Sequence, residues 1–232
     1  MSANVDLLLF GVFPYVAIAL AVILTIIRYS TNRYSVSSLS SQFLESKRLF
    51  WGSLSFHWGI LIVLAGHLIG LLFPRSVMAF NAVPVRLAIL EITALAFGIL
   101  ALIGIVLLCG RRITSERIRV VTSRWDVLLL AILLVQIATG VFTAVFHRWG
   151  SSWYVHTAVP YLVSLGRLSP EVGLVASLPL MVKLHIASAF ALVAVLPMTR
   201  LIHLLAVPIG YLWRPYQLVV WNRRPNAARE RQ

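Results

Sequence analysis

The stretch SFHWGILIVLAGHLIG, residues 55–70, lies in an apolar run long enough to cross a membrane, yet it carries two histidines. About 20 helical residues are needed to span the ~30 Å of hydrocarbon in a bilayer. The sequence contains five runs of that length: residues 5–28, 49–73, 86–109, 126–146 and 181–209. With 60% hydrophobic and 12% charged residues, the chain is predicted to be an all-α, polytopic membrane helix bundle that forms a single domain over residues 1–232.

The basic residues predict how the bundle is oriented in the membrane. Of the 20 lysines and arginines, 15 fall on the side of the odd-numbered connections and the C-terminal tail, WNRRPNAARERQ, and 5 fall on the other side. The positive-inside rule therefore predicts an N-terminus outside and a tail in the cytoplasm. This topology explains the net charge of +13, so nucleic acid is not an expected partner. The arginine-rich face is expected to meet anionic lipid or an acidic cytoplasmic partner.

The connection 147–180 is apolar but broken by prolines and glycines. This pattern predicts short interfacial helices that cap the outer side rather than a sixth span. Its two histidines, His147 and His156, are expected to be surface residues rather than ligands. The single cysteine of the chain, Cys109, excludes a Cys-x-x-Cys-His haem attachment site and an iron–sulfur cluster held by this chain alone.

The other four histidines lie inside two predicted spans, His57 and His67 in the second, and His185 and His203 in the fifth. Because these helices run in opposite directions, His57 and His203 are expected at one depth, toward the cytoplasm. His67 and His185 are expected together at the outer depth. Within each pair, the two histidines would face each other across a gap. This is the arrangement needed to hold a metal centre from opposite sides.

The spacing within each helix bears on the kind of metal centre. Ten residues separate the pair on the second helix, a rise of ~15 Å, and eighteen separate the pair on the fifth, ~27 Å. Helix crossing, tilted ligand planes and a bend at Pro197 must absorb the difference of ~12 Å. A tilted porphyrin tolerates such offsets and a compact ion does not, which predicts two bis-histidine b-type haems serving electron transfer. Gly59, Gly66 and Gly70 are expected to let the ring edge approach the backbone.

Three segments resemble the gamma subunit of membrane-bound respiratory nitrate reductase, a diheme cytochrome b. They are SSLSSQFLESKRLFWGSLSFHWGILIVLAGHLIGLLFP at 37–74, KLH at 183–185, and TRLIHLLAVPIGYLWRPYQLV at 199–219. The resemblance covers nearly the whole chain and is weakest in 147–180 and at the extreme C-terminus. Its specificity lies in four histidines in the family's order and spacing.

The resemblance implies that His67 and His185 ligate the distal haem b, near the outer face, and that His57 and His203 ligate the proximal one. It implies a quinol oxidation site beside the distal haem, lined by Gly66 and the start of the third helix, which takes menaquinol or ubiquinol from the quinol pool. Electrons would pass from the distal to the proximal haem, then to a cytoplasmic iron–sulfur beta subunit and a molybdenum-containing alpha subunit that reduces nitrate. The implied location is the cytoplasmic (inner) membrane of a bacterium or archaeon.

The chain departs from the family pattern at the start of the third helix. Where the family has a lysine that assists quinol binding, this sequence has Leu87, with Arg86 beside it. Arg86 is expected either to donate to a quinol oxygen as a permanently charged group or to be an interfacial topology residue. Glu91 is expected to neutralise Arg86 or Lys183, with acceptance of a quinol proton as the alternative.

Charged residues near the cytoplasmic ends of the helices have their own expected roles. Arg200, one turn before His203, is expected to pair with a propionate of the proximal haem. Arg111 and Arg112 could pair with the same propionates, but they are expected to meet lipid headgroups instead. Asp126 is expected to begin the fourth helix, where its charge suits the helix dipole.

Two other functions stay open at this point. A diheme cytochrome b could serve another quinone-linked complex, of sulfite reductase or heterodisulfide type, because the haem pattern says nothing about the terminal acceptor. The chain could also be a haem-free transporter or assembly scaffold whose histidines carry protons or form polar contacts between helices, in which case it would show no Soret band.

Overall fold

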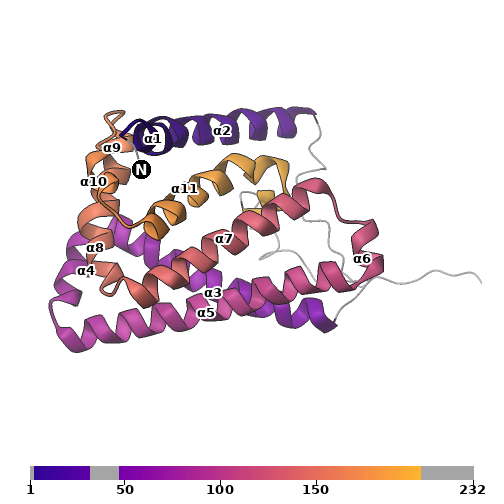
Figure 1. Ribbon diagram of the computed structural model, residues 1–232, viewed down its shortest axis with the longest axis horizontal. Helices are drawn as coiled ribbons and strands as arrows, with labels where there is room; N and C mark the ends of the chain where they lie inside the picture. The colour runs from indigo at the N-terminus through magenta and orange to yellow at the C-terminus, as the bar shows by residue number, and fades with distance from the viewer. Residues whose placement is uncertain (1–2, 32–46, 205–232) are drawn as a thin grey trace, which may run out of the picture.

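The computed structural model describes residues 3–31 and 47–204 (Figure 1). Every regular element in these residues is a helix. Five helices are long and apolar enough to span a membrane: Ala3–Thr31, Leu49–Leu72, Pro84–Thr114, Arg124–Phe146 and Leu180–Met198. The predicted all-α, five-span architecture is thus confirmed for this part of the chain. Residues 205–209 of the predicted fifth span and the C-terminal tail lie outside the described residues.

The five spans are built from the following elements. The first comprises α1 (Ala3–Leu7), the π-helical η1 (Leu8–Val12) and α2 (Phe13–Thr31). The second is α3 (Lys47–Leu72), the third α5 (Pro84–Thr114) and the fourth α7 (Arg124–Phe146). The fifth is α11 (Leu180–Val195), followed by the 3₁₀ turns η4 (Leu196–Met198) and η5 (Arg200–Leu204).

Short helices gather at one end of the bundle, on the left in Figure 1. They are α4 (Pro74–Asn81), α8 (Gly150–Trp153), η3 (Tyr154–Ala158), α9 (Val159–Gly166) and α10 (Gly173–Ala176). We call this the short-helix end; all but α4 come from the segment 147–180. The opposite end carries α6 (Glu116–Val120). We call it the arginine end after the arginines in and around this helix: Arg111, Arg112, Arg117, Arg119 and Arg124.

The spans pack in the order α3, α5, α7, α11, α2. The main core lies between α5 and α7 and is built from Ala101, Ile105, Leu129, Leu133 and Ile137. A second core joins the N-terminal helix to the short helices, where the Tyr161 hydroxyl donates to the Phe10 carbonyl over 2.7 Å. In the described part of the chain, α3 and α11 are not a closely packed pair, because each lies against other neighbours.

Two glycines set the distance between α3 and α5. A Cβ atom at Gly104 would lie 2.3 Å from the Phe56 backbone nitrogen, and one at Gly59 would lie 2.5 Å from the Ala101 nitrogen. Gly59 therefore serves helix packing, and the expectation that it admits a macrocycle is wrong. A Cβ at Gly70 would meet the Tyr154 ring at 2.8 Å, whereas a Cβ at Gly66 would meet nothing within 4 Å.

The fifth span is interrupted close to the expected bend. Helix α11 ends at Val195, Pro197 lies in η4, and Thr199 is extended with φ −114° and ψ 178°. The chain then turns back toward the other helices (Figure 1). Proline lacks the N–H that a continuing helix needs. A continuous helical rise between His185 and His203, assumed from the sequence, therefore does not occur, and the offset of ~12 Å derived from it disappears.

Candidate metal centres

The structure brings four histidines together as two facing pairs. The imidazole centroids of His57 on α3 and His203 on η5 are 6.3 Å apart, with ring planes inclined at 51°. Those of His67 on α3 and His185 on α11 are 6.4 Å apart, with planes inclined at 40°. The side chains of His57, His67 and His203 are exposed and that of His185 is half-buried, so all four are accessible to a ligand.

These separations fit one metal ion between each pair of rings. A bond from a metal to an imidazole nitrogen is about 2 Å long, and the ring centroid lies roughly an ångström beyond the nitrogen, which gives centroids roughly 6 Å apart. Among the described residues, no group of three or more His, Cys, Asp or Glu side chains is placed to hold an ion. Two imidazoles per site, with the remaining ligands supplied by a macrocycle, would suit haem iron.

All four imidazoles are oriented by the same kind of hydrogen bond. In each, Nδ1 lies within hydrogen-bond distance of a backbone carbonyl, which places the proton on Nδ1 and leaves the Nε2 lone pair for a metal. The distances are 2.7 Å from His57 to Ser53, 2.8 Å from His67 to Val63, 2.9 Å from His185 to Gln136 and 2.7 Å from His203 to Arg200. Each of the four imidazoles would therefore bind a metal through Nε2.

His185 alone takes its backbone acceptor from a neighbouring helix. On α7, the Gln136 carbonyl accepts from its Nδ1, the Thr139 hydroxyl lies 3.2 Å from the same nitrogen, and a Cβ at Gly140 would lie 2.8 Å from its Cε1. The Gln136 side-chain amide lies 3.2 Å from His185 Nε2 and accepts from the Ser188 hydroxyl. A metal ion at Nε2 would displace this amide nitrogen.

Sequence reasoning missed these contacts between His185 and α7, although the sequence contains a signal for them. Gln136, Thr139 and Gly140 lie three and four residues apart within an otherwise apolar span, and such residues share one helix face. A polar stripe inside a membrane helix indicates that this face meets other helices rather than lipid.

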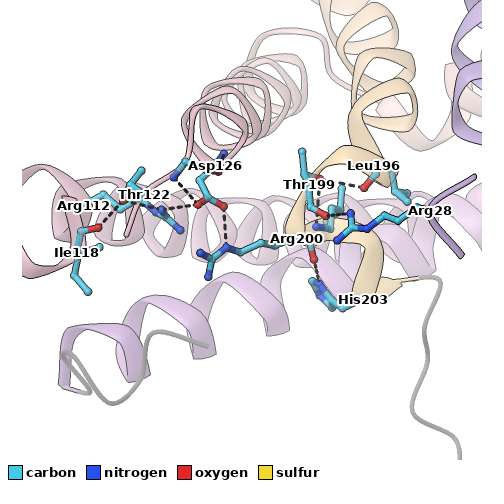
Figure 2. A network of polar contacts seen from close by, with 11 residues as sticks. Arg28, Arg112, Ile118, Thr122, Asp126, Leu196, Thr199, Arg200 and His203 are labelled. Atoms are coloured by element: carbon cyan, nitrogen blue, oxygen red, sulfur yellow. Dashed lines mark hydrogen bonds and ion pairs between the residues drawn. The ribbon is translucent and has the colours of Figure 1, made fainter. Parts of the chain in front are cut away.

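At the arginine end, a buried carboxylate joins three helices (Figure 2). Asp126 forms a reciprocal capping box with Ser123 at the start of α7, which confirms its expected place there. Its side chain is only 4% exposed and also pairs with Arg112 of α5 at 3.4 Å and with Arg200 of η5 at 2.9 Å. The expectation that Arg112 meets lipid headgroups is wrong, because its partner is the Asp126 carboxylate. The same expectation is wrong for Arg111, because this residue is only 3% exposed.

The residues expected to form a quinol site lie toward the short-helix end. Gly66 faces open space, and Arg86 is exposed in the first turn of α5, with its guanidinium carbon 5.8 Å from the centroid of the Phe80 ring. Tyr154, which sequence reasoning missed, contacts the His67 ring at 5.1 Å and donates to the His67 carbonyl over 3.0 Å. Burial raises the pKa of the Tyr154 phenol, so this group stays a neutral donor.

Lys183 and Glu91 have partners other than those expected. Lys183 forms an ion pair with Asp6 of α1 at 3.1 Å, and both side chains are 7% exposed. Glu91 accepts hydrogen bonds from the Ser151 backbone nitrogen at 2.8 Å and from its hydroxyl. The expectation that Glu91 neutralises Lys183 is therefore wrong, and within the described ranges no ion pair joins it to Arg86.

The two histidines of the connecting segment lie apart from both pairs. His147 caps the end of α7 with its ring 6.2 Å from that of Phe142, and His156 on η3 is exposed.

Comparison with known proteins gives one consistent result. The family model described as the nitrate reductase gamma subunit matches residues 6–222. The nitrate reductase gamma chain of Bacillus subtilis (strain 168) is 33% identical over 220 residues, covering 94% of this chain and 98% of the relative. The respiratory nitrate reductase 1 gamma chain of Escherichia coli (strain K12) is 35% identical, covering 92% of this chain and 96% of the relative.

A third relative is much longer than this chain. The nitrate reductase-like protein NarX of Mycobacterium tuberculosis is 33% identical over 217 residues, which cover 90% of this chain but 33% of that protein. The similarity to NarX therefore concerns one part of it.

Proposed function

The chain belongs to the nitrate reductase gamma subunit family, and from this premise we propose that it is a diheme cytochrome b subunit that oxidises quinol near the outer membrane face. Membership makes it a multi-pass membrane subunit of an oxidoreductase complex. The proposal adds two b-type haems, the side on which quinol reacts, and the direction in which electrons leave.

The observation that carries the proposal is the pair of facing imidazoles found twice along α3. His67 and His185 would hold the distal haem, and His57 and His203 the proximal haem, each through the Nε2 that its Nδ1 hydrogen bond leaves available. When bound, the two haems supply one-electron carriers through which electrons pass from the distal to the proximal side. The protein contributes fixed ligand directions and an apolar surrounding between the helices.

Gly66 and Arg86 are proposed to line the quinol site. The open space at Gly66 would admit a quinone ring beside His67. Arg86 is exposed and permanently charged, so it would donate to a quinol oxygen but would not accept its proton. Arg86 would thereby replace the lysine that the family pattern places at the next position, where this chain has Leu87.

The orientation proposed here has the N-terminus outside and the arginine end in the cytoplasm of a bacterial or archaeal inner membrane. The distribution of 15 against 5 basic residues supports it. Electrons would leave the proximal pair toward an iron–sulfur beta subunit and a molybdenum-containing alpha subunit. The name gamma chain, carried by the relatives, supports partner subunits of a nitrate reductase in general. Oxidising quinol outside and passing charge inward conserves about 2.3 kcal/mol per charge for each 100 mV of membrane potential.

The test is a reduced-minus-oxidised spectrum of the purified full chain with a haem count by pyridine haemochrome. We expect two b-type haems per chain and reduction of both by a soluble quinol. A chain extracted under mild conditions that shows no Soret band, from membranes equally colourless, would exclude the cytochrome and favour the haem-free transporter. Copurification with molybdenum and iron–sulfur subunits would separate a nitrate reductase from another quinone-linked complex.

A separate prediction concerns the contacts that hold His185 against α7. Replacing Gly140 with alanine puts a methyl group 2.8 Å from Cε1 of His185, so the imidazole must turn and its Nδ1 bond to α7 is lost. We expect retention of the distal haem to fall roughly tenfold or more, as outer-shell changes commonly cause, while the proximal haem stays.

The matched control is Gly98→Ala on α5, where the new methyl group would meet Val141 at an ordinary 3.4 Å. The haem count of both variants checks the prediction. Equal retention of two haems by Gly140→Ala and Gly98→Ala would show that the contacts with α7 do not orient His185.

A further inference from the structure

His203 differs from the other three paired histidines in the element that carries it. His57, His67 and His185 lie within long α-helices, whose hydrogen-bond ladders fix the backbone. His203 lies in the 3₁₀ turn η5, beyond the end of α11 and after the extended residue Thr199. Short 3₁₀ turns have poorer hydrogen-bond geometry than α-helices. The direction of the His203 imidazole therefore depends on contacts from outside its own segment.

Arg200 connects His203 to a fixed point on another helix. Its backbone carbonyl accepts the hydrogen bond from His203 Nδ1 at 2.7 Å. Its side-chain Nε lies 2.9 Å from the Asp126 carboxylate. The main chain of Arg200 thus orients the His203 imidazole, and the side chain of Arg200 anchors that main chain to Asp126 (Figure 2).

Asp126 is suited to be the fixed point. Its carboxylate is 4% exposed and is held by the Ser123 backbone nitrogen at 3.1 Å and by Arg112 at 3.4 Å. It belongs to the first turn of α7, where the helix dipole favours a negative charge. It also separates two guanidinium groups, Arg112 and Arg200, that would otherwise repel each other across the same site.

The opposite side of the turn is held by α2. Arg28 donates to the carbonyl of Thr199 at 3.4 Å and to that of Pro197. The Thr199 hydroxyl donates to the Leu196 carbonyl at 3.2 Å and accepts from the Leu201 nitrogen at 3.3 Å. These contacts fix where the turn begins, and the Asp126 contact fixes how Arg200 leaves it (Figure 2).

We propose that Asp126 is a positioning residue for the His57–His203 pair and acts on His203 through Arg200. This inference rests on the proposed haem function and deepens it, since it assigns the geometry of the proximal site to a carboxylate on a helix that carries none of the four histidines. It also gives Arg200 a role that does not require contact with a haem propionate.

Removing the charge while keeping the shape of the side chain tests the proposal in the purified full chain. For Asp126→Asn, we expect the low-spin signal of the proximal haem in electron paramagnetic resonance to shift, because it reports the angle between the two imidazole planes. The rate at which apomyoglobin extracts that haem should rise about tenfold or more. The signal and extraction rate of the distal haem should not change, and Asp126→Glu should restore much of the wild-type behaviour.

Two controls separate positioning from general loss of stability. Glu116→Gln removes a carboxylate at the same end whose ion pair with Arg119 is exposed, with the Glu116 side chain 89% accessible; it should leave both haems unchanged. Ser123→Ala removes the reciprocal cap of α7 without removing the charge of Asp126. It should lower the melting temperature without a selective effect on the proximal haem.

A double variant tests whether the two residues act in series. Arg200→Gln should reproduce the selective effect of Asp126→Asn, and combining both should add little, since they belong to one chain of contacts. Additive effects would show that Arg200 acts on the haem independently of Asp126 and would overturn the proposal. So would wild-type signals from both haems in Asp126→Asn, or equal loss of both.

Should Asp126→Asn fail to fold, Arg200→Gln carries the same test. The absence of haem from the wild-type chain would refute the proposed function itself, whereas two haems in the wild type with no selective effect in these variants would refute only this inference.

Discussion

Replacing His67 or His185 with alanine is expected to remove the distal haem and leave the proximal one, and replacing His57 or His203 should do the reverse. Under the proposed function, each pair would share one metal between rings whose centroids are 6.3 or 6.4 Å apart, so loss of one imidazole would release the metal of that pair only. Because the two proposed carriers would act in series, quinol-dependent nitrate reduction should fall at least ~100-fold in all four variants. Haem counts and steady-state activity measure the two effects.

The matched controls are His147→Ala and His156→Ala, because these two histidines lie in the connecting segment and belong to neither pair. They should keep two haems. An artificial donor that reduces the partner subunits directly should still support nitrate reduction in every variant, which would show that the complex remains assembled. Retention of two haems by His67→Ala would refute the assignment of the distal ligands.

Replacing Gly104 with alanine is expected to remove both haems together. The added methyl group would lie 2.3 Å from the Phe56 nitrogen and 2.6 Å from its Cα, and no side-chain rotation relieves contact with a backbone. Overpacking costs about 1–3 kcal/mol, which exceeds the gain of ~1 kcal/mol that alanine offers within a helix. Helix α3 would move away from α5, and α3 supplies one histidine to each pair.

Gly98→Ala on the same helix is the control, since its methyl group would meet only the Val141 side chain at 3.4 Å. Thermal unfolding and haem content of the two variants measure the difference. A Gly104→Ala chain with two haems and the melting temperature of Gly98→Ala would contradict the close α3–α5 contact. The joint loss expected here contrasts with the loss of the distal haem alone expected for Gly140→Ala.

The partnership of the histidines could be predicted because it depends on quantities that a sequence contains. The length of each span follows from the length of its apolar run. The direction of each span follows from its place in the chain, because the chain crosses back with every successive span. Together these place His57 beside His203 and His67 beside His185, and the structure has the same pairs. The rise along the fifth span was misjudged, since Pro197 ends regular helix near Val195 and the chain turns back.

The contacts that orient the histidines were not predictable in the same way. Gln136 meets His185 and Asp126 meets Arg200 because α7 presents those faces to its neighbours, and Lys183 meets Asp6 rather than Glu91. Which face a membrane helix turns toward which neighbour is weakly encoded in composition, because lipid and protein interior are similarly apolar.

The sequence by itself therefore determined the five spans and the pairing of four histidines, through hydrophobic length and chain direction. Only the tertiary structure decided the rotation of each helix about its axis. That rotation determines the contacts of His185 with α7, the anchoring of Arg200 by Asp126, and the glycine contact between α3 and α5. Those features arise from side-chain packing between segments far apart in the chain, where a few atoms within 4 Å decide which neighbour is met.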